Sequence, residues 1–140
     1  MVRLSNIELI KILEKNARES FTNIAKIFGV SEAAIRKRIK KLEKEGIIKR
    51  YTIEVDYKKL GFDIHALIGI DTIPEKYLST IEKLKKIEEI RSLFSSTGDH
   101  MILIEVFLKD QNSLIEFIKK IEKIEGVTKI CPAIILEKMK

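Results

Sequence analysis

The chain contains 140 residues, of which 45% are apolar and 34% charged, enough for one ordinary domain or two small ones. No apolar run approaches the roughly 18 residues that a membrane-spanning helix needs. The N-terminal segment is too short and too charged for a signal peptide, so we expect a soluble cytoplasmic protein without a membrane partner. Cys131 is the only cysteine, which excludes an intrachain disulfide, and it forms no zinc-ligand spacing with His65 and His100. We predict no metal ion and no cofactor.

The excess of positive charge lies in the first part of the chain. Residues 1–60 contain 15 Lys and Arg against 8 Asp and Glu, whereas residues 61–140 contain 12 against 13. This distribution indicates a polyanion as the partner of the first part. The composition is rich in Ile, Lys and Glu with a single Gln, a bias that is typical of proteins from hyperthermophiles.

The first 46 residues predict three helices. Ser5 and Glu8 form a capping-box pattern, so a first helix begins there and ends near Asn16. A second helix begins at Ser20 or Thr22. The inward residues of these two helices are expected to be Ile7, Ile10, Leu13, Ile24, Ile27 and Phe28.

A tight turn at residues 28–31 separates the second helix from a third. Gly29 can adopt the left-handed conformation that ends a helix, and Ser31 is placed to cap the next one, which Gly46 ends. This arrangement predicts a helix-turn-helix, whose second helix enters the major groove of DNA. On the third helix, Ile35, Ile39 and Leu42 share an inward face.

The opposite face of the third helix is basic and carries small residues at its tip, which lets the backbone approach base edges. A solvated basic face without a partner is the simpler interpretation of such a run, but the turn and the cap before it favour DNA binding. The candidate DNA-binding residues are Thr22, Ser31, Ala33, Ala34, Arg36, Lys37, Arg38, Lys40 and Lys41.

After Gly46 the pattern changes to alternating apolar and polar residues, which indicates a wing or a connecting strand over residues 47–56. We assign residues 1–52 to a winged helix-turn-helix domain, 53–61 to a connecting strand or hinge, and 62–140 to a second domain. The second domain is predicted to contain strands at residues 64–71, 90–96, 100–108 and 127–136. One helix begins at Pro74, with Leu78, Ile81 and Leu84 inward, and another is capped by Ser113 with Glu116. The inward residues of this last helix are expected to be Leu114, Ile118 and Ile121.

The order strand, helix, strand, strand, helix, strand predicts a ferredoxin-like βαββαβ domain, and the chain as a whole belongs to the α+β class. Both faces of the third strand are largely apolar, although helices cover only one face of a two-layer sandwich. We therefore expect a homodimer formed sheet against sheet. On this interpretation Val106→Asp separates the subunits.

These features together resemble the Lrp/AsnC, or feast/famine, regulators. The resemblance rests on AIRKRIKKLEKEGIIKRYT in the helix-turn-helix and on STGDH before the third strand of the βαββαβ domain. It implies a sequence-specific transcriptional regulator that binds palindromic double-stranded promoter DNA as a dimer or a larger even-numbered oligomer. It also implies a small-molecule effector, usually an amino acid, near Thr97, Gly98 and Asp99. The chain departs from the family pattern at Met101, where an aspartate is common, and at Ile130–Ala133, where Thr and Ser are common.

Three other functions fit parts of this pattern. The βαββαβ order also occurs in RNA-recognition motifs, but Phe107 is the only aromatic residue of the third strand and this half lacks excess positive charge. Sirohaem decarboxylases share the two-domain plan, yet no nucleophile–base pair is evident, so we predict no catalytic residues. An architectural DNA-coating protein remains an alternative to a regulator of specific promoters.

Overall fold

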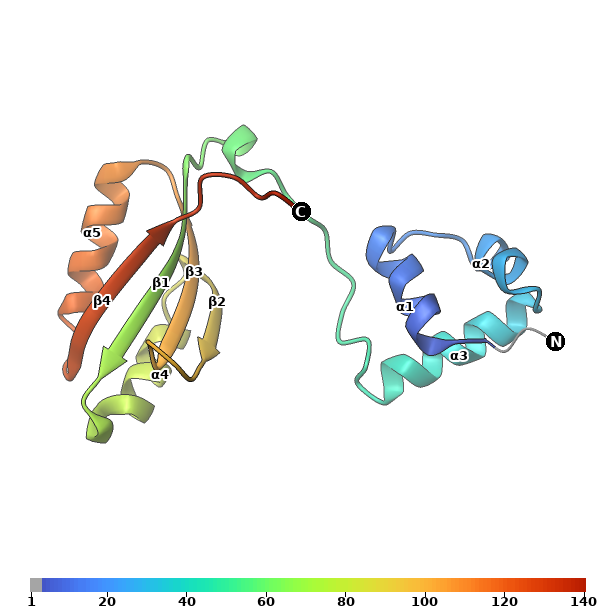
Figure 1. Ribbon diagram of the computed structural model, residues 1–140, viewed down its shortest axis with the longest axis horizontal. Coiled ribbons are helices and arrows are strands. Elements are labelled where there is room, and N and C mark those ends of the chain that lie inside the picture. The colour runs from blue at the N-terminus through green and yellow to red at the C-terminus, as the bar shows by residue number, and fades with distance from the viewer. Residues whose placement is uncertain (1–3) are drawn as a thin grey trace. The chain divides into compact units, whose positions relative to one another are not determined.

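The computed structural model describes residues 4–140 and separates them into two compact units, one ending at Glu54 and the other beginning at Val55 (Figure 1). The division lies inside the predicted connecting segment, residues 53–61. Within the described residues, no helix has both the length and the apolar character needed to cross a membrane.

The first unit contains the three predicted helices: α1 (Asn6–Lys15), α2 (Phe21–Phe28) and α3 (Glu32–Lys44). Each begins after a serine whose hydroxyl accepts a hydrogen bond from the backbone N–H three residues later; the serines are Ser5, Ser20 and Ser31. Gly29 ends α2 with φ of 64°, a left-handed conformation that costs glycine little. The helix-turn-helix is therefore confirmed, together with its caps.

The core of the first unit is formed by the fully or nearly fully buried Leu9, Leu13, Ile24, Ala25, Phe28, Ile35, Ile39 and Leu42. The prediction that Ile7 and Ile27 point inward is wrong, because these side chains are 68% and 63% exposed. Leu9 and Leu13 define the buried stripe of α1, and at 3.6 residues per turn Ile7 lies on the opposite side of the helix from Leu9. Ile27 lies outside the narrow stripe that Ile24 and Phe28 define on α2.

Residues 49–56 belong to no helix or strand. The predicted wing or connecting strand does not form within the described part of the single chain, although the sequence there alternates. A strand needs a hydrogen-bonding neighbour, and no strand of the described chain pairs with this segment. Two of its apolar residues, Tyr51 and Ile53, are at least half exposed.

The second unit has the predicted βαββαβ order, preceded by a short 3₁₀ helix, η1 (Tyr57–Leu60). The strands are β1 (Ile64–Thr72), β2 (Ile90–Ser95), β3 (Ile102–Leu108) and β4 (Val127–Ile134), and the helices are η2 (Pro74–Lys76), α4 (Tyr77–Lys85) and α5 (Gln111–Glu122). The sheet order is β2-β3-β1-β4, and every pairing is antiparallel. Pro132 lies on β4, an edge strand, where a residue without a backbone N–H is tolerated.

The helices α4 and α5 pack on one face of the sheet (Figure 1), where alternate residues of β1 and β3 are buried against Leu84, Leu114, Phe117 and Ile121. Two details of these helices were predicted wrongly. Leu78 is 75% exposed, because α4 buries Thr80 and Leu84 and Leu78 lies on the other side. The cap of α5 is Asp110, whose carboxylate accepts from the Ser113 N–H at 2.8 Å, so Ser113 with Glu116 is not the cap.

The opposite face of the sheet carries no helix. Leu67, Phe94 and Leu103 lie on this open face and are 40%, 53% and 37% exposed. Val106 is fully buried on the face covered by the helices. Val106→Asp would therefore disrupt the core, and a probe of the open face must be placed at Leu103.

Candidate nucleic-acid interface and ligand site

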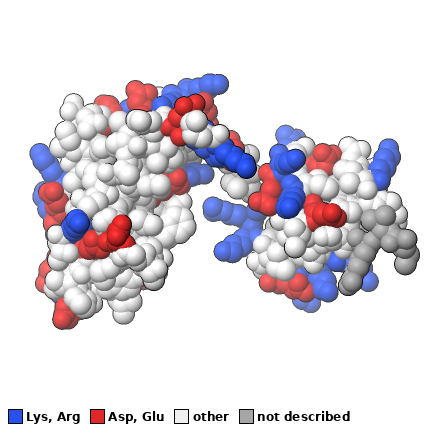
Figure 2. Space-filling model, in the orientation of Figure 1, with Lys and Arg blue, Asp and Glu red and all other residues white. Residues whose placement is uncertain are grey.

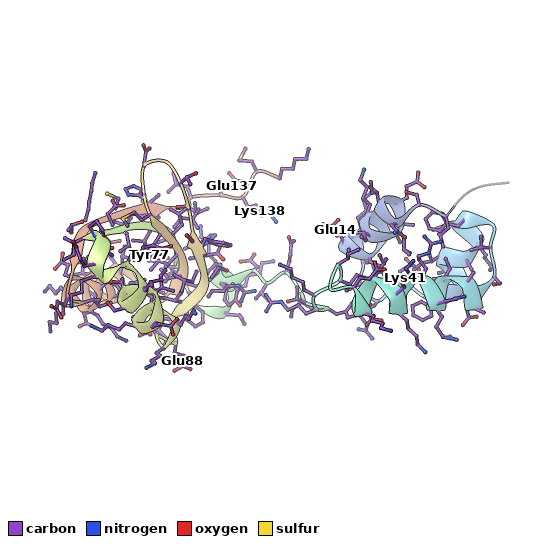
Figure 3. The ribbon with its side chains drawn as sticks, turned by 90° about the horizontal axis from the view of Figure 1, so that it is seen from below. Glu14, Lys41, Tyr77, Glu88, Glu137 and Lys138 are labelled. Atoms are coloured by element: carbon purple, nitrogen blue, oxygen red, sulfur yellow. The ribbon has the colours of Figure 1, made fainter. Side chains whose placement is uncertain are left out.

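The predicted DNA-binding residues lie on α3 and on the N-terminal turn of α2. Ala33, Arg36, Lys37, Lys40 and Lys41 are exposed, whereas Ala34 and Arg38 are partly buried. Figure 2 shows Lys and Arg side chains on several sides of the first unit, and Figure 3 places Lys41 on α3. Within residues 4–140, Lys37 and Lys40 make no hydrogen bond or ion pair, which leaves their ammonium groups available to an anion.

Arg36 is held by two neighbouring side chains, Glu32 and Phe21. Its Nη2 atom lies 3.0 Å from Glu32 Oε1, one helical turn earlier, and its guanidinium carbon lies 5.3 Å from the centre of the Phe21 ring. The second carboxylate oxygen of Glu32 accepts a hydrogen bond from Thr22 Oγ1 at 3.2 Å. We call Phe21, Thr22, Glu32 and Arg36 the Arg36 cluster. Sequence reasoning selected Thr22 and Arg36 but missed Glu32 and Phe21; the i, i+4 spacing of Glu32 and Arg36 was the available signal.

Other candidates already have partners within the chain. Ser31 caps α3 by accepting from the Ala34 N–H at 3.1 Å. Arg38 Nη1 donates to Asn6 Oδ1 of α1 at 2.9 Å, and Lys41 lies 3.9 Å from Glu45. Arg38 therefore joins α1 to α3. Its guanidinium is less available to bind a phosphate than the ammonium groups of Lys37 and Lys40.

The predicted effector residues Thr97, Gly98 and Asp99 form the exposed turn between β2 and β3, with Gly98 at φ of 100°. The residues that follow this turn contact a carboxylate from another strand: Asp71 of β1 accepts from His100 Nδ1 and from the Met101 backbone N–H, both at 2.9 Å. The hydrogen bond from His100 lowers the pKa of Asp71, and the Met101 N–H adds to this effect against the opposing effect of burial.

The His100 ring lies directly over the backbone of Gly69. A Cβ atom at position 69 would be 2.2 Å from His100 Cδ2, so only glycine fits beneath the ring. Near the end of β2, the Ser95 hydroxyl lies 2.6 Å from Tyr77 Oη of α4 (Tyr77 is labelled in Figure 3). Sequence reasoning missed the Asp71–His100 pair, because these residues are 29 positions apart and meet only through the strand register.

The open sheet face also carries an aromatic stack. Phe107 lies between His65 and Tyr57, with ring centres 4.2 Å apart on each side. His65 Nε2 donates to Glu105 at 2.8 Å, and Arg91 donates to the Tyr57 hydroxyl. This stack fixes η1, the first element after residue 54, to the sheet.

Comparison with known proteins identifies both units. A winged helix-turn-helix DNA-binding family matches residues 4–49, and the Lrp/AsnC ligand binding domain matches residues 65–140. The chain belongs to the Lrp/AsnC family. The HTH-type transcriptional regulator LrpA of Pyrococcus abyssi is 53% identical over 133 residues, which cover 94% of each chain.

Solved structures of this family have the same fold. E. coli AsnC is 30% identical, with a TM-score of 0.85 over 99% of this chain and 95% of that one. A feast or famine regulatory protein of M. tuberculosis, in complex with L-methionine, is 22% identical, with a TM-score of 0.86 over 94% of this chain and 90% of that one. Membership in the Lrp/AsnC family confirms the predicted class, a DNA-binding transcriptional regulator rather than an enzyme. The Pyrococcus relative comes from a thermophilic archaeon, which agrees with the bias toward Ile, Lys and Glu in the composition.

Proposed function

We propose that this Lrp/AsnC regulator binds palindromic promoter sites as a homodimer in the cytoplasm, with α3 of each subunit in a major groove. The observation that carries the proposal is the exposed basic face of α3, where Lys37 and Lys40 have no partner within the described chain. Phosphate contacts supply most of the affinity of such a helix, and side chains at base edges supply the specificity. A dimer presents two such helices, and its half-sites lie about one or more DNA turns apart.

The open face of the sheet supports the proposed dimer. Leu67, Phe94 and Leu103 lie on this face, and a second copy of the same face would remove them from water. In the view of Figure 2, charged side chains gather toward the edges of the second unit and much of its middle carries none. Even-numbered assemblies above the dimer follow from contacts between such dimers.

DNA binding is tested by selecting genomic fragments with the purified protein at near-physiological salt. Enrichment of one palindromic sequence supports a regulator of specific promoters, whereas enrichment without a common sequence supports the architectural alternative. On the selected site, Lys37→Ala is expected to weaken binding by about 1–3 kcal/mol. Lys83→Ala, an exposed lysine of α4, removes the same charge from the second unit and serves as the control. Equal effects of the two variants would contradict the assigned face of α3.

We further propose that a small ligand with an amino group, such as an amino acid, binds beside Thr97, Gly98 and Asp99. The carboxylate of Asp71 supports this class, because it lies against the residues that follow the turn and its lowered pKa keeps it charged. An ammonium group is the natural partner of such a carboxylate. Calorimetric titration with each of the common amino acids tests the proposal, and failure of all of them to bind would overturn it.

A further inference from the structure

The first turn of the DNA-facing helix α3 carries a carboxylate, which DNA phosphates repel. Glu32 is the first residue of α3, and its side chain is 48% exposed. Its two oxygens are engaged by different residues, Oε1 by Arg36 at 3.0 Å and Oε2 by Thr22 at 3.2 Å. Glu32 therefore links the start of α2 to the second turn of α3.

These contacts restrict the conformations that the Arg36 guanidinium can adopt. Glu32 holds one end of it, and the Phe21 ring lies 5.3 Å from its central carbon. An unrestrained arginine loses rotamer entropy when it binds, and restricting its side chain beforehand reduces that loss. A guanidinium has five N–H donors in a fixed fork. Glu32 receives one hydrogen bond from Nη2, so other donors remain for a base edge.

We propose that Glu32 is a positioning residue that orients Arg36 to read a guanine in the major groove. This inference rests on the proposed function, in which α3 enters that groove. Arginine donates in a bidentate manner to guanine O6 and N7, the commonest specific contact between protein and DNA. The carboxylate of Glu32 simultaneously repels phosphates, so it lowers affinity for DNA of any sequence. The Arg36 cluster thus increases the ratio of specific to non-specific binding.

The decisive measurement is this specificity ratio, obtained from binding constants for the selected site and for an unrelated duplex at the same salt concentration. Glu32→Gln keeps the size of the side chain and removes its charge. Because the carboxylate no longer repels phosphates, affinity for the unrelated duplex is expected to rise. Because Arg36 is less well oriented, the specificity ratio is expected to fall by about three- to tenfold, part of the discrimination that one bidentate arginine–guanine contact provides.

A matched control separates orientation from charge. Glu43→Gln removes the same charge from an exposed position of α3 that does not touch Arg36. This variant is expected to raise affinity for both duplexes equally and to leave the specificity ratio unchanged. If Glu32→Gln also raises both affinities equally, Glu32 only repels DNA and the proposal is overturned. Circular dichroism of both variants is expected to show the wild-type helix content, and a loss of helix would mark a variant that is not folded.

Chemical change of the DNA identifies the base. Replacing guanines of the half-site one at a time by 7-deazaguanine removes the N7 acceptor. At one position, this replacement is expected to weaken DNA binding by the wild-type protein but to have little effect on binding by the Arg36→Lys variant. Lysine keeps the positive charge but lacks the forked pair of donors that contacts O6 and N7 together. If every position affects both proteins equally, Arg36 does not read guanine. The wild-type protein on the two duplexes tests the proposed function separately, because specific binding by wild type with no change in the Glu32 variant overturns only this inference.

Discussion

Replacing Gly69 by alanine is expected to displace the His100 ring from its place beside the predicted effector turn. The added Cβ would lie 2.2 Å from His100 Cδ2 and 2.4 Å from Cγ, closer than side-chain atoms approach in folded proteins. The ring must therefore move, and its 2.9 Å hydrogen bond to Asp71 is lost or distorted. Overpacking at a close contact costs about 1–3 kcal/mol and the loss of one hydrogen bond to a charged group about 1.5–3 kcal/mol, so the two together cost about 2.5–6 kcal/mol.

A double-mutant cycle measures this coupling. The free energy of unfolding is obtained from guanidinium chloride titrations at one fixed protein concentration, because dissociation of an oligomer makes stability depend on concentration. His100→Ala removes the imidazole ring and so leaves space for a methyl group at position 69. In that background, Gly69→Ala is expected to cost less than about 0.5 kcal/mol.

A second glycine provides the control. Gly61 has φ of 94°, and a Cβ there meets no atom within 4 Å, so Gly61→Ala strains the backbone without touching His100. Its cost is expected to be the same with and without His100. The reasoning is refuted if Gly69→Ala and His100→Ala are additive, because the methyl group and the ring would then not compete for the same space.

Three further predictions concern the open face, the helix caps and acid stability. If the proposed dimer forms through the open sheet face, Leu103→Asp on that face is expected to give a monomer in light scattering. Leu78→Asp, on the exposed side of α4, is expected to leave the proposed dimer intact, and a dimeric Leu103 variant would exclude the sheet-to-sheet interface. Ser31→Ala removes the cap of α3 and is expected to reduce the stability of the first unit by about 0.5–2 kcal/mol, measured by the loss of helix circular dichroism on heating; an unchanged midpoint would contradict the capping role. Because the pKa of Asp71 is lowered in the folded state from its ordinary 3.8, its contribution to stability is present above that value and is lost as the pH falls through the folded pKa. Asp71→Asn is therefore expected to flatten the decline of unfolding free energy below about pH 4, and a decline as steep as in wild type would assign the acid sensitivity to other carboxylates.

The helices of the first unit could be predicted closely from the sequence because their signals are local. Ser31 lies three residues before the N–H that it accepts from, and Gly29 lies directly at the turn. A capping hydrogen bond joins residues only three positions apart, so it can be predicted without knowledge of the tertiary fold. The burial of individual apolar side chains could be predicted less well. Ile7 and Leu78 fit an apolar stripe in the sequence, but their burial depends on which side of the helix the neighbouring elements cover.

The same distinction between local and distant contacts divides the candidate sites. The pair Glu32 and Arg36 is separated by one helical turn, so its spacing is visible in the sequence once α3 is assigned. The stack of Tyr57, Phe107 and His65 joins residues from η1, β3 and β1, and no spacing along the chain predicts it. Contacts of this second kind follow from strand register, which sequence patterns specify only through the whole sheet.

Met101 illustrates how contacts set by strand register change the interpretation of the predicted ligand site. Compared with the family pattern, a methionine in place of an aspartate suggests that the ligand site has lost a carboxylate. In the fold, the backbone N–H of Met101 donates to Asp71, which β1 brings to the same end of β3. The negative charge beside the turn is therefore supplied by a neighbouring strand, with His100 holding it in place. Under the proposed function, Asp71 therefore takes the place of a carboxylate at position 101 as the partner of the ligand's ammonium group.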